Sequence, residues 1–391
     1  MRASFVSFVG VFLTLMGLFY AYMGKRLFSF GWPQNRTTGW LLLALPLVLM
    51  VLMPVLFYLR HRNPHHETPD WVFWVVYLSM SFMSVLLTVI AVRDLALLAG
   101  KLTARFFPAA APWASGLESA GVSQVLVLAA VTLTFWGLFQ ASRTPRIHRV
   151  DVSVPGLAAP FDGYKVALIS DLHIGPTIKR GFVERVVREV NGLDADLAVL
   201  PGDVADGVPS DLTSDTAPLA EVHAKDGLYY ATGNHEYYWN APAWVVEMAR
   251  LGWKPLLNSN VVLERGGAKL IVAGVTDPTA FRAQPDQAPD FRKALEGAPP
   301  DVPALWLAHQ PTAAIEAAPI RGGLMLSGHT HGGQWFPWSL VIHLVQPYVK
   351  GLYRRGGLAL YVTPGTGYWG PPNRWGVPSE VTLLVLHPEK K

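Results

Sequence analysis

The residues of this sequence that could do chemistry stand at the ends of five short apolar runs. They are carboxylates, imidazoles and one amide: Asp171 and His173, Asp203 and Asp206, Asn234 and His235, His309, and His329 and His331. Oxygen and nitrogen ligands of these types suit Mn²⁺, Fe or Zn²⁺ better than soft metals. Any one of them alone is typical of a turn, a helix cap or a buried polar residue. Together, and in this order, they indicate a metal site.

The apolar runs predict the elements that position these residues. Short apolar runs predict buried strands, and the amphipathic stretches between them predict helices. We expect strands at Val166–Ser170, Leu197–Leu200, Leu228–Thr232, Leu270–Val275, Leu305–Ala308, Leu324–Ser327, Leu358–Val362 and Glu380–Leu386, and helices at Phe182–Leu193, Ala243–Leu251 and Phe291–Glu296. This alternation predicts an α/β domain, in which the carboxyl ends of strands line the ligand crevice. Residues between positions 171 and 331 can therefore converge on one site.

The same blocks carry a family resemblance. They are Asp171-x-His173, Gly202-Asp203-x-x-Asp206, Gly233-Asn234-His235-Glu236, His309 and Gly328-His329-x-His331. This signature resembles that of the calcineurin-like metallophosphoesterases, and the resemblance covers roughly residues 164–387. The motifs at 328–334 and 363–367 look most like a bacterial, membrane-linked branch that includes UDP-2,3-diacylglucosamine pyrophosphate hydrolases. The resemblance implies a fold of two mixed β-sheets sandwiched together and flanked by helices.

The resemblance also implies a role for each residue. Two divalent metal ions are expected, Mn²⁺ first, with Fe or Zn²⁺ as alternatives. The implied ligands are Asp171, His173 and His331 for one ion, Asn234, His309 and His329 for the other, and Asp203 between them. His235 is implied to donate a hydrogen bond or proton to the leaving oxygen, oriented by Asp206. Such a pair of ions activates water for attack on a phosphate ester.

One departure from the family pattern narrows the range of expected substrates. Phosphoprotein phosphatases of this superfamily have Arg-Gly after the second aspartate, whereas Gly207 and Val208 follow Asp206 here. This difference favours a phosphodiester or a pyrophosphate over a phosphoprotein. Arg374 is a candidate for the missing phosphate-binding cation, and a surface arginine stacked on Trp375 is the alternative.

The composition divides the chain into two parts. Of its 391 residues 51% are hydrophobic and 15% are charged, the mean hydropathy is +0.27, and there is no cysteine. Residues 1–140 hold nine Lys or Arg and four Asp or Glu, while residues 141–391 have an ordinary globular charge content. These values exclude disorder for most of the chain and any thiolate metal site or disulfide framework. Without clustered Lys and Arg on a folded domain, we expect no nucleic-acid partner.

The first part contains four apolar segments long enough to span a bilayer. They are Phe5–Met23, Trp40–Leu59, Trp71–Val92 and Val122–Phe139, and none holds a charged residue. About 20 apolar residues cross the hydrocarbon core as a helix. We therefore expect a four-helix transmembrane region at 1–140, a linker and first strand at 141–160, and the metallophosphoesterase domain at 161–391. Without an intramembrane charge a transporter is disfavoured, and an anchor in the lipid bilayer is expected.

The membrane face is not decided by charge. Four spans place both chain ends on one side, and six basic residues lie on each side. The resemblance to lipid-precursor hydrolases favours a multi-pass protein of a bacterial inner membrane with its catalytic domain on the cytoplasmic face.

An aromatic segment follows the last metal motif. It contains Trp335, Phe336 and Trp338, and the basic residues Lys350 and Arg354 come shortly after it. Such a segment is typical of contact with lipid headgroups, and a cap folded onto the sandwich is the open alternative. Either location beside the metal site favours an amphipathic phosphate ester as the substrate.

These observations lead to one expected function and its alternatives. We expect a membrane-anchored, dinuclear-metal phosphoesterase that hydrolyses a phosphodiester or pyrophosphate bond of a lipid-linked molecule. The alternatives are a phosphodiesterase for soluble nucleotides or for generic diesters, and a membrane-tethered metal or phosphate sensor with little turnover.

Overall fold

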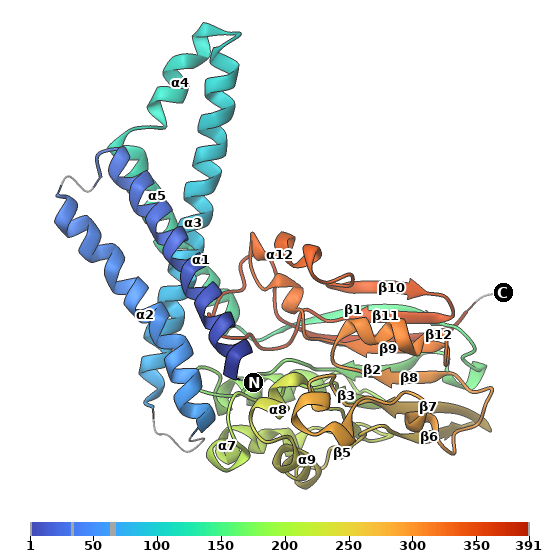
Figure 1. Ribbon diagram of the computed structural model, residues 1–391. Helices are drawn as coiled ribbons and strands as arrows, with labels where there is room; N and C mark the ends of the chain where they lie inside the picture. The colour runs from blue at the N-terminus through green and yellow to red at the C-terminus, as the bar shows by residue number, and fades with distance from the viewer. Residues whose placement is uncertain (1, 33–34, 63–67, 390–391) are drawn as a thin grey trace. The chain divides into compact units, whose positions relative to one another are not determined.

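The computed structural model describes residues 2–32, 35–62 and 68–389 (Figure 1). The chain divides into two compact units. The first comprises Met1–Phe139 together with Gly370–Asn373, and the second comprises Gln140–Trp369 and Arg374–Lys391.

The first unit is helical. Its helices are α1 (Arg2–Ser29), α2 (Arg36–Arg62), α3 (Asp70–Ala104), the short α4 (Ala111–Gly116) and α5 (Ala120–Ser142), whose last three residues belong to the second unit. The four apolar segments of the sequence lie in α1, α2, α3 and α5. Within the described part of the chain, α3 and α5 are long and apolar enough to cross a membrane. Membrane crossing by α1 and α2 stays a prediction.

Helix α3 extends beyond the expected end at Val92 and includes the charged residues Arg93 and Asp94. Asp94 accepts hydrogen bonds from Arg26 Nε at 2.5 Å, Tyr22 Oη at 2.6 Å and Arg93 Nε at 2.7 Å. The guanidinium of the buried Arg93 also lies 4.4 Å from the ring centre of Phe30. Tyr22 and Arg26 of α1, together with the neighbouring Arg93, compensate the charge of Asp94 where the helix continues.

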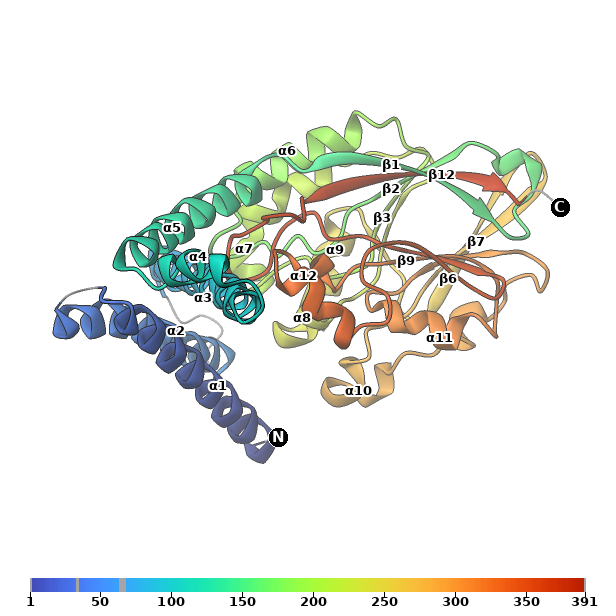
Figure 2. The same cartoon turned by 90° about the horizontal axis from the view of Figure 1, so that it is seen from above.

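The second unit consists of two mixed six-stranded sheets, as the resemblance implied (Figures 1 and 2). The first sheet has the order β1 (Arg146–Val154), β12 (Glu380–Pro388), β2 (Tyr164–Leu168), β3 (Leu197–Leu200), β4 (Leu228–Tyr230) and β5 (Lys254–Pro255). The second has the order β10 (Gly351–Arg355), β11 (Leu358–Val362), β9 (Gly323–Ser327), β8 (Ala304–Leu307), β7 (Ala268–Gly274) and β6 (Ser259–Arg265). Strands β2 to β5 run parallel in the first sheet, and β7, β8, β9 and β11 run parallel in the second.

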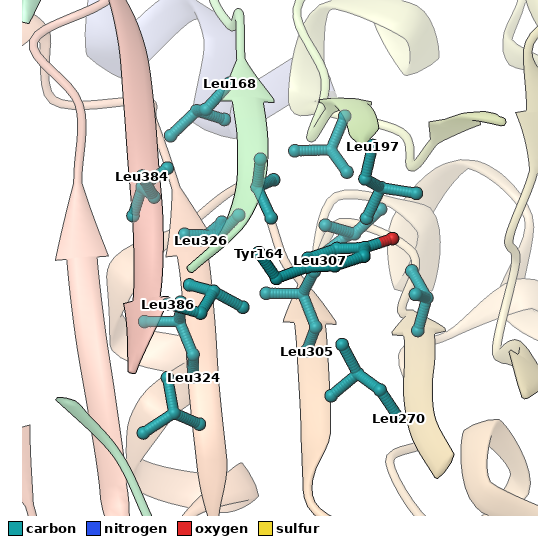
Figure 3. Packing of buried hydrophobic residues seen from close by; sticks show 14 of the residues in the cluster. Tyr164, Leu168, Leu197, Leu270, Leu305, Leu307, Leu324, Leu326, Leu384 and Leu386 are labelled. Atoms are coloured by element: carbon teal, nitrogen blue, oxygen red, sulfur yellow. The ribbon is translucent and has the colours of Figure 1, made fainter. Parts of the chain in front are cut away.

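Alternate residues of these strands form two layers of core. Leu305 and Leu307 of β8 pack between the sheets with residues such as Leu168 and Leu384 (Figure 3). Trp306, the residue between them, belongs to a second cluster that includes Ala314 and residues of β7 and β11. Burial on both faces explains why the parallel strands are continuous apolar runs in the sequence.

Short helices complete the second unit. They are α6 (Arg180–Asn191), α7 (Pro209–Thr216), α8 (Asn234–Tyr238), α9 (Ala241–Arg250), α10 (Ala280–Ala283), α11 (Ala314–Ala317) and α12 (Trp338–Val341). Helices α10 and α11 lie on the outer side of the second sheet in Figure 2. Helix α6 buries Phe182, Val186 and Val190 on one face, as its apolar spacing predicts.

The structure differs from the sequence-based expectation where packing is weak. The helix expected at Phe291–Glu296 is only a 3₁₀ turn at Lys293–Leu295. Strands β6 and β10, which the apolar runs did not predict, are the edge strands of the second sheet. An edge strand is half exposed, so it needs no continuous apolar run, and β10 accordingly reads Gly-Leu-Tyr-Arg-Arg.

Candidate metal centre

The predicted ligands lie where the central strands of both sheets end. Asp171 and His173 follow β2, Asp203 follows β3, and Asn234 and His235 begin α8 after β4. The second sheet contributes His309 after β8, and His329 and His331 after β9. The two sheets therefore meet at one site through the carboxyl ends of their strands.

Five of these residues have positive φ angles. They are Asp171, His173, Asp203, His329 and His331, with φ between 50° and 71°. Residues other than glycine rarely adopt this conformation, although Asp and His tolerate it better than most. Backbone strain of this kind is concentrated at functional sites, where the surrounding structure holds it in place. Here it turns the chain sharply at the ends of β2, β3 and β9.

Asp171, His173 and His331 form a first group. One ligand atom of each lies within 4.8 Å of the others, and all three residues are buried. The Nε2 atoms of His173 and His331 are 3.1 Å apart, and His331 Nε2 is 3.6 Å from Asp171 Oδ1. Two imidazole nitrogens that face each other at this distance suit a shared cation.

Asp203 joins this group to a second one. Its Oδ2 is 3.1 Å from His309 Nε2 and 3.8 Å from the Nε2 atoms of both His173 and His235. Asp171, Asp203 and His309 also offer ligand atoms that lie within 4.8 Å of one another. Asp203 therefore occupies the central position that a bridging carboxylate requires.

Asn234 and His329 lie on the His309 side of the site. Asn234 Oδ1 is 3.0 Å from His329 Nδ1, and the rings of His309 and His329 have centres 5.2 Å apart. The backbone N–H of His329 donates to Asp171 Oδ1 at 2.9 Å. All seven predicted ligands are thus brought together.

His235 and Asp206 form the expected pair. His235 Nδ1 is 2.5 Å from Asp206 Oδ1, and the same oxygen is 3.3 Å from His173 Nδ1. The contact between Nδ1 and the carboxylate leaves Nε2 of His235 on the side of Asp203.

The charged groups of the site shift the pKa values of one another. Burial opposes ionisation of Asp203, but the imidazoles of His309, His235 and His173 outweigh it and hold the Asp203 pKa well below its ordinary value. Burial lowers the pKa of His235 and of His309, but the facing carboxylates prevail and raise them to about 9 and about 10. The site therefore has a negative potential that favours cations.

The residues fit a pair of divalent ions. Among the described residues, Asp171 Oδ2 and His309 Nε2 are buried without a hydrogen-bond partner. A buried polar atom without a partner costs stability unless an ion or water satisfies it. His309 Nε2 lies 3.1 Å from Asp203 Oδ2 but is not aligned to bond it, an arrangement typical of two ligands of one ion. The donor set of oxygen and imidazole nitrogen suits Mn²⁺, Fe or Zn²⁺.

Arg374 lies behind the site. Its side chain is fully buried, and it donates hydrogen bonds to the backbone oxygens of Gly367, Pro364 and His331. Its Nη2 atom is also 3.2 Å from His331 Nδ1. This placement favours a role in positioning His331, and contact between Arg374 and a substrate stays a prediction.

The aromatic segment after the metal motif is buried at its start and exposed at its end. Trp335 is buried, and Phe336 is partly buried with its ring centre 5.7 Å from that of Trp375. Trp338 is exposed, and so are the apolar residues that follow it: Leu340, Val341, Leu344 and Val345.

Sequence reasoning missed Glu236 as a member of the site. Its buried carboxylate accepts hydrogen bonds from the backbone N–H groups of Gly233, Asp203 and Val204. Burial and the nearby charge of Asp203 raise the pKa of Glu236 to about 7. A signal was present, because a glutamate three residues after the helix N-cap is half of a capping box.

Comparison with known proteins agrees with this geometry. The family model described as calcineurin-like phosphoesterase matches residues 164–333. A zebrafish (Danio rerio) protein named "Transmembrane protein with metallophosphoesterase domain" is 34% identical over 98% of this chain and 89% of its own length. The bovine (Bos taurus) protein of the same name is 39% identical over 66% of this chain, which spans only 61% of the bovine length. An uncharacterized metallophosphoesterase of Helicobacter pylori is 36% identical over 66% of this chain and 68% of its own length.

Proposed function

This chain belongs to the calcineurin-like phosphoesterase family, and from that premise we propose that it is a metal-dependent hydrolase of phosphoric ester or anhydride bonds. The observation that carries the proposal is the convergence of seven candidate ligands from five strand ends, with Asp203 at their centre. Neighbouring ligand atoms lie 3.0–3.8 Å apart.

Each side chain has a proposed part in the reaction. Asp171, His173 and His331 would hold one divalent ion, and Asn234, His309 and His329 the other, with Asp203 shared. When bound, the two ions supply activated water and neutralise the charge of the phosphate. We propose Mn²⁺ as the natural metal.

His235 is proposed as the general acid. The hydrogen bond from its Nδ1 to Asp206 fixes the ring and leaves the Nε2 proton directed toward the metal ligands. Burial opposes protonation of His235, but the carboxylates of Asp203 and Asp206 outweigh it and raise its pKa, which favours a protonated ring that can donate to the leaving oxygen. Asp206 acts through His235 and is a positioning residue.

The proposed substrate is a lipid-linked phosphodiester or pyrophosphate. Three features support it: Gly207 replaces the arginine of phosphoprotein phosphatases, two helices are apolar enough to span a membrane, and an exposed apolar segment follows the metal motif. Similar relatives also bear the name of transmembrane proteins. Hydrolysis of a soluble nucleotide diester is the competing outcome.

The anchor and the location are proposals as well. We propose that α1, α2, α3 and α5 form a four-helix membrane anchor in a bacterial cell membrane, with the catalytic domain on the cytoplasmic face. The sequence placed Trp335 on the lipid-contact surface, but this residue is buried, so the surface that we propose begins at Trp338. It consists of Trp338, Leu340, Val341, Leu344 and Val345, with the exposed cation Lys350 following shortly. Phe336, which is partly buried, stays a candidate at its margin.

The decisive experiment separates metal binding from proton donation. Purified full-length protein in lipid nanodiscs, loaded with Mn²⁺, should hydrolyse bis(p-nitrophenyl) phosphate. His235→Ala should lower kcat by about 10²–10⁴-fold while the bound Mn²⁺ is retained, because only the acid is lost. Asp203→Asn should lose both activity and bound metal.

Two exposed residues on the same domain give matched controls. His387→Ala and Asp151→Asn remove partners of a surface ion pair and should leave activity unchanged. Full activity in both His235→Ala and Asp203→Asn would contradict the proposal, and tight phosphate binding without turnover would indicate a sensor. A panel of lipid-linked pyrophosphates beside nucleotide diesters then decides the substrate class.

A further inference from the structure

Two exposed aromatic side chains contact the proposed general acid. The ring centre of Tyr238 lies 5.0 Å from that of His235 with an interplanar angle of 58°, and that of Trp369 lies 5.8 Å away at 80°. His235 itself is buried, yet Tyr238 is 38% exposed and Trp369 is 51% exposed. Large aromatic rings that remain exposed beside a buried reactive group are typical of a binding surface.

Helix α8 fixes the position of Tyr238. His235 and Tyr238 are three residues apart on this helix, so their side chains lie on the same face. The helix begins with Asn234, one of the candidate ligands. Tyr238 is therefore held at a defined distance from the metal centre and does not sit on a free loop.

Trp369 is held from two directions. Gln334, the last residue of the Gly-His-Thr-His-Gly-Gly-Gln motif, accepts the backbone N–H of Trp369 at 3.0 Å and donates to its carbonyl oxygen at 3.2 Å. The preceding residues Thr366 and Gly367 donate their backbone N–H groups to the carbonyl oxygens of Ser170 and Asp171. The loop that carries Trp369 is thus tied to the two segments that supply the first group of ligands.

We infer that Tyr238 and Trp369 form a subsite for the leaving group of the substrate, and that this group presents a ring face, such as that of a sugar, a nucleobase or an aryl group. The inference rests on the proposed function, because it concerns the group released by the same hydrolysis. The leaving oxygen must lie within hydrogen-bond reach of His235, so the group attached to it lies beside the two rings that contact His235. A ring face packs on an aromatic side chain more favourably than a chain of equal size.

The test compares two substrates that differ only in the leaving group. We choose methyl phenyl phosphate and a methyl phosphate ester of a fluorinated alcohol whose acidity matches that of phenol. The measured quantity is the ratio of kcat/KM for the aryl ester to kcat/KM for the alkyl ester, in the Mn²⁺-loaded full-length protein. Trp369→Ala and Tyr238→Ala should each lower this ratio by about five- to tenfold. Trp369→Phe should restore most of it.

The ratio of the two kcat/KM values distinguishes a residue that binds the leaving group from one that only supports the structure. A structural defect lowers kcat/KM for both esters equally and leaves the ratio unchanged, and that result would overturn the inference. Trp338→Ala, a tryptophan on the proposed lipid-contact surface, is the matched control and should not change the ratio. If the wild-type protein hydrolyses neither ester, the proposed function itself fails, which is a distinct outcome.

The variants also show which kind of ring is bound. A sugar phosphate diester and a nucleoside phosphate diester are compared in the wild type and in Trp369→Ala. The natural class is the one that loses more kcat/KM in the variant. Equal and small losses for both would also count against the subsite.

Discussion

At the scale of single residues, the candidate centre depends on close backbone approach as much as on the ligand side chains. Gly233 packs against Asp203, and Gly328 packs against Asp171 and Ser170. A Cβ atom at either glycine would collide with the carboxylate beside it. The glycines of the motifs therefore make room for the ligands, which gives a physical reason for their position beside them.

Gly328→Ala should weaken metal binding. The added methyl group would meet Asp171 Oδ2 and Ser170 Oγ and displace a ligand of the first group. We expect the affinity for Mn²⁺ to fall by about 10- to 100-fold, the range found when a neighbour of a metal ligand is changed. Titration of the apoprotein with Mn²⁺, with free Mn²⁺ followed by electron paramagnetic resonance, measures this.

Gly181→Ala is the matched control for that experiment. A Cβ atom at Gly181 has open space around it, and alanine is the better helix former in α6. Its Mn²⁺ affinity should equal that of the wild type. Unchanged binding in Gly328→Ala as well would show that Asp171 is not a ligand.

At the scale of elements, one arginine joins the two sheets at the end away from the metal centre. Arg265, the last residue of β6, donates to Asp196 Oδ1 at 3.0 Å and to Asp226 Oδ2 at 3.1 Å, just before β3 and β4. Its guanidinium also lies 4.6 Å from the ring centre of Tyr164. Burial opposes ionisation of Asp196, but the N–H of Lys165 and the charge of Arg265 outweigh it and lower the pKa of Asp196.

Arg265→Ala should destabilise the catalytic domain in a pH-dependent way. Because the folded pKa of Asp196 lies below its unfolded value, the stabilisation is complete above the unfolded pKa and disappears as pH falls through the folded pKa. We expect a loss of about 1–2 kcal/mol at neutral pH, since Arg265 is 35% exposed and water screens part of the interaction. The difference in Tm from the wild type should be a few degrees at neutral pH and should shrink in acid.

Lys269→Ala supplies the comparison. Lys269 of β7 pairs with Glu264 of β6, and both side chains are well exposed, so this ion pair contributes little. Its Tm should stay close to that of the wild type at every pH. A difference for Arg265→Ala that is equally large at neutral and at acid pH would exclude the proposed charge interaction.

The exposed segment α12 and the residues after it should contact lipid. Because the chain has no cysteine, a single cysteine at Leu344, which is 83% exposed, can carry an environment-sensitive fluorophore. In nanodiscs we expect a blue-shifted emission that spin-labelled lipids quench, since the label enters the interfacial region. The same label at Val246, an exposed residue of α9, should report water. Identical spectra at both positions would exclude the lipid contact.

At the scale of the whole molecule, the number of membrane crossings is open to a direct test. Four spans place the α1–α2 connection and the catalytic domain on opposite sides of the membrane, whereas crossing by α3 and α5 alone places them on the same side. Thr37→Cys and Val246→Cys, both at exposed positions, mark these two regions. We expect a membrane-impermeant maleimide added to intact cells to label one of them and not the other. Labelling of both, or of both only after lysis, would favour two spans.

Much of this protein was predictable from local sequence. The central strands could be located because they are buried on both faces and must be continuous apolar runs. The candidate ligands could be located because metal chemistry restricts the residue types, and because the ends of parallel strands meet at one edge. Their assignment to two ions came from the family resemblance. Composition alone was also enough to distinguish the apolar, charge-poor part of the chain from the part with an ordinary globular composition.

The rest was decided by tertiary structure, because it depends on which distant groups become neighbours. Local sequence left Arg374 as either a phosphate-binding cation or a surface arginine stacked on Trp375. The surface location is wrong, because the fold buries the guanidinium among backbone carbonyls behind His331. The charged end of α3 is helical because Asp94 meets Arg26 of α1, which no local pattern encodes. Trp369 is held beside His235 by distant parts of the chain: Gln334, 35 residues earlier, bonds its backbone, and the loop before it is bonded to Ser170 and Asp171. Residue type fixes what a side chain can do, and only packing determines what it is placed against.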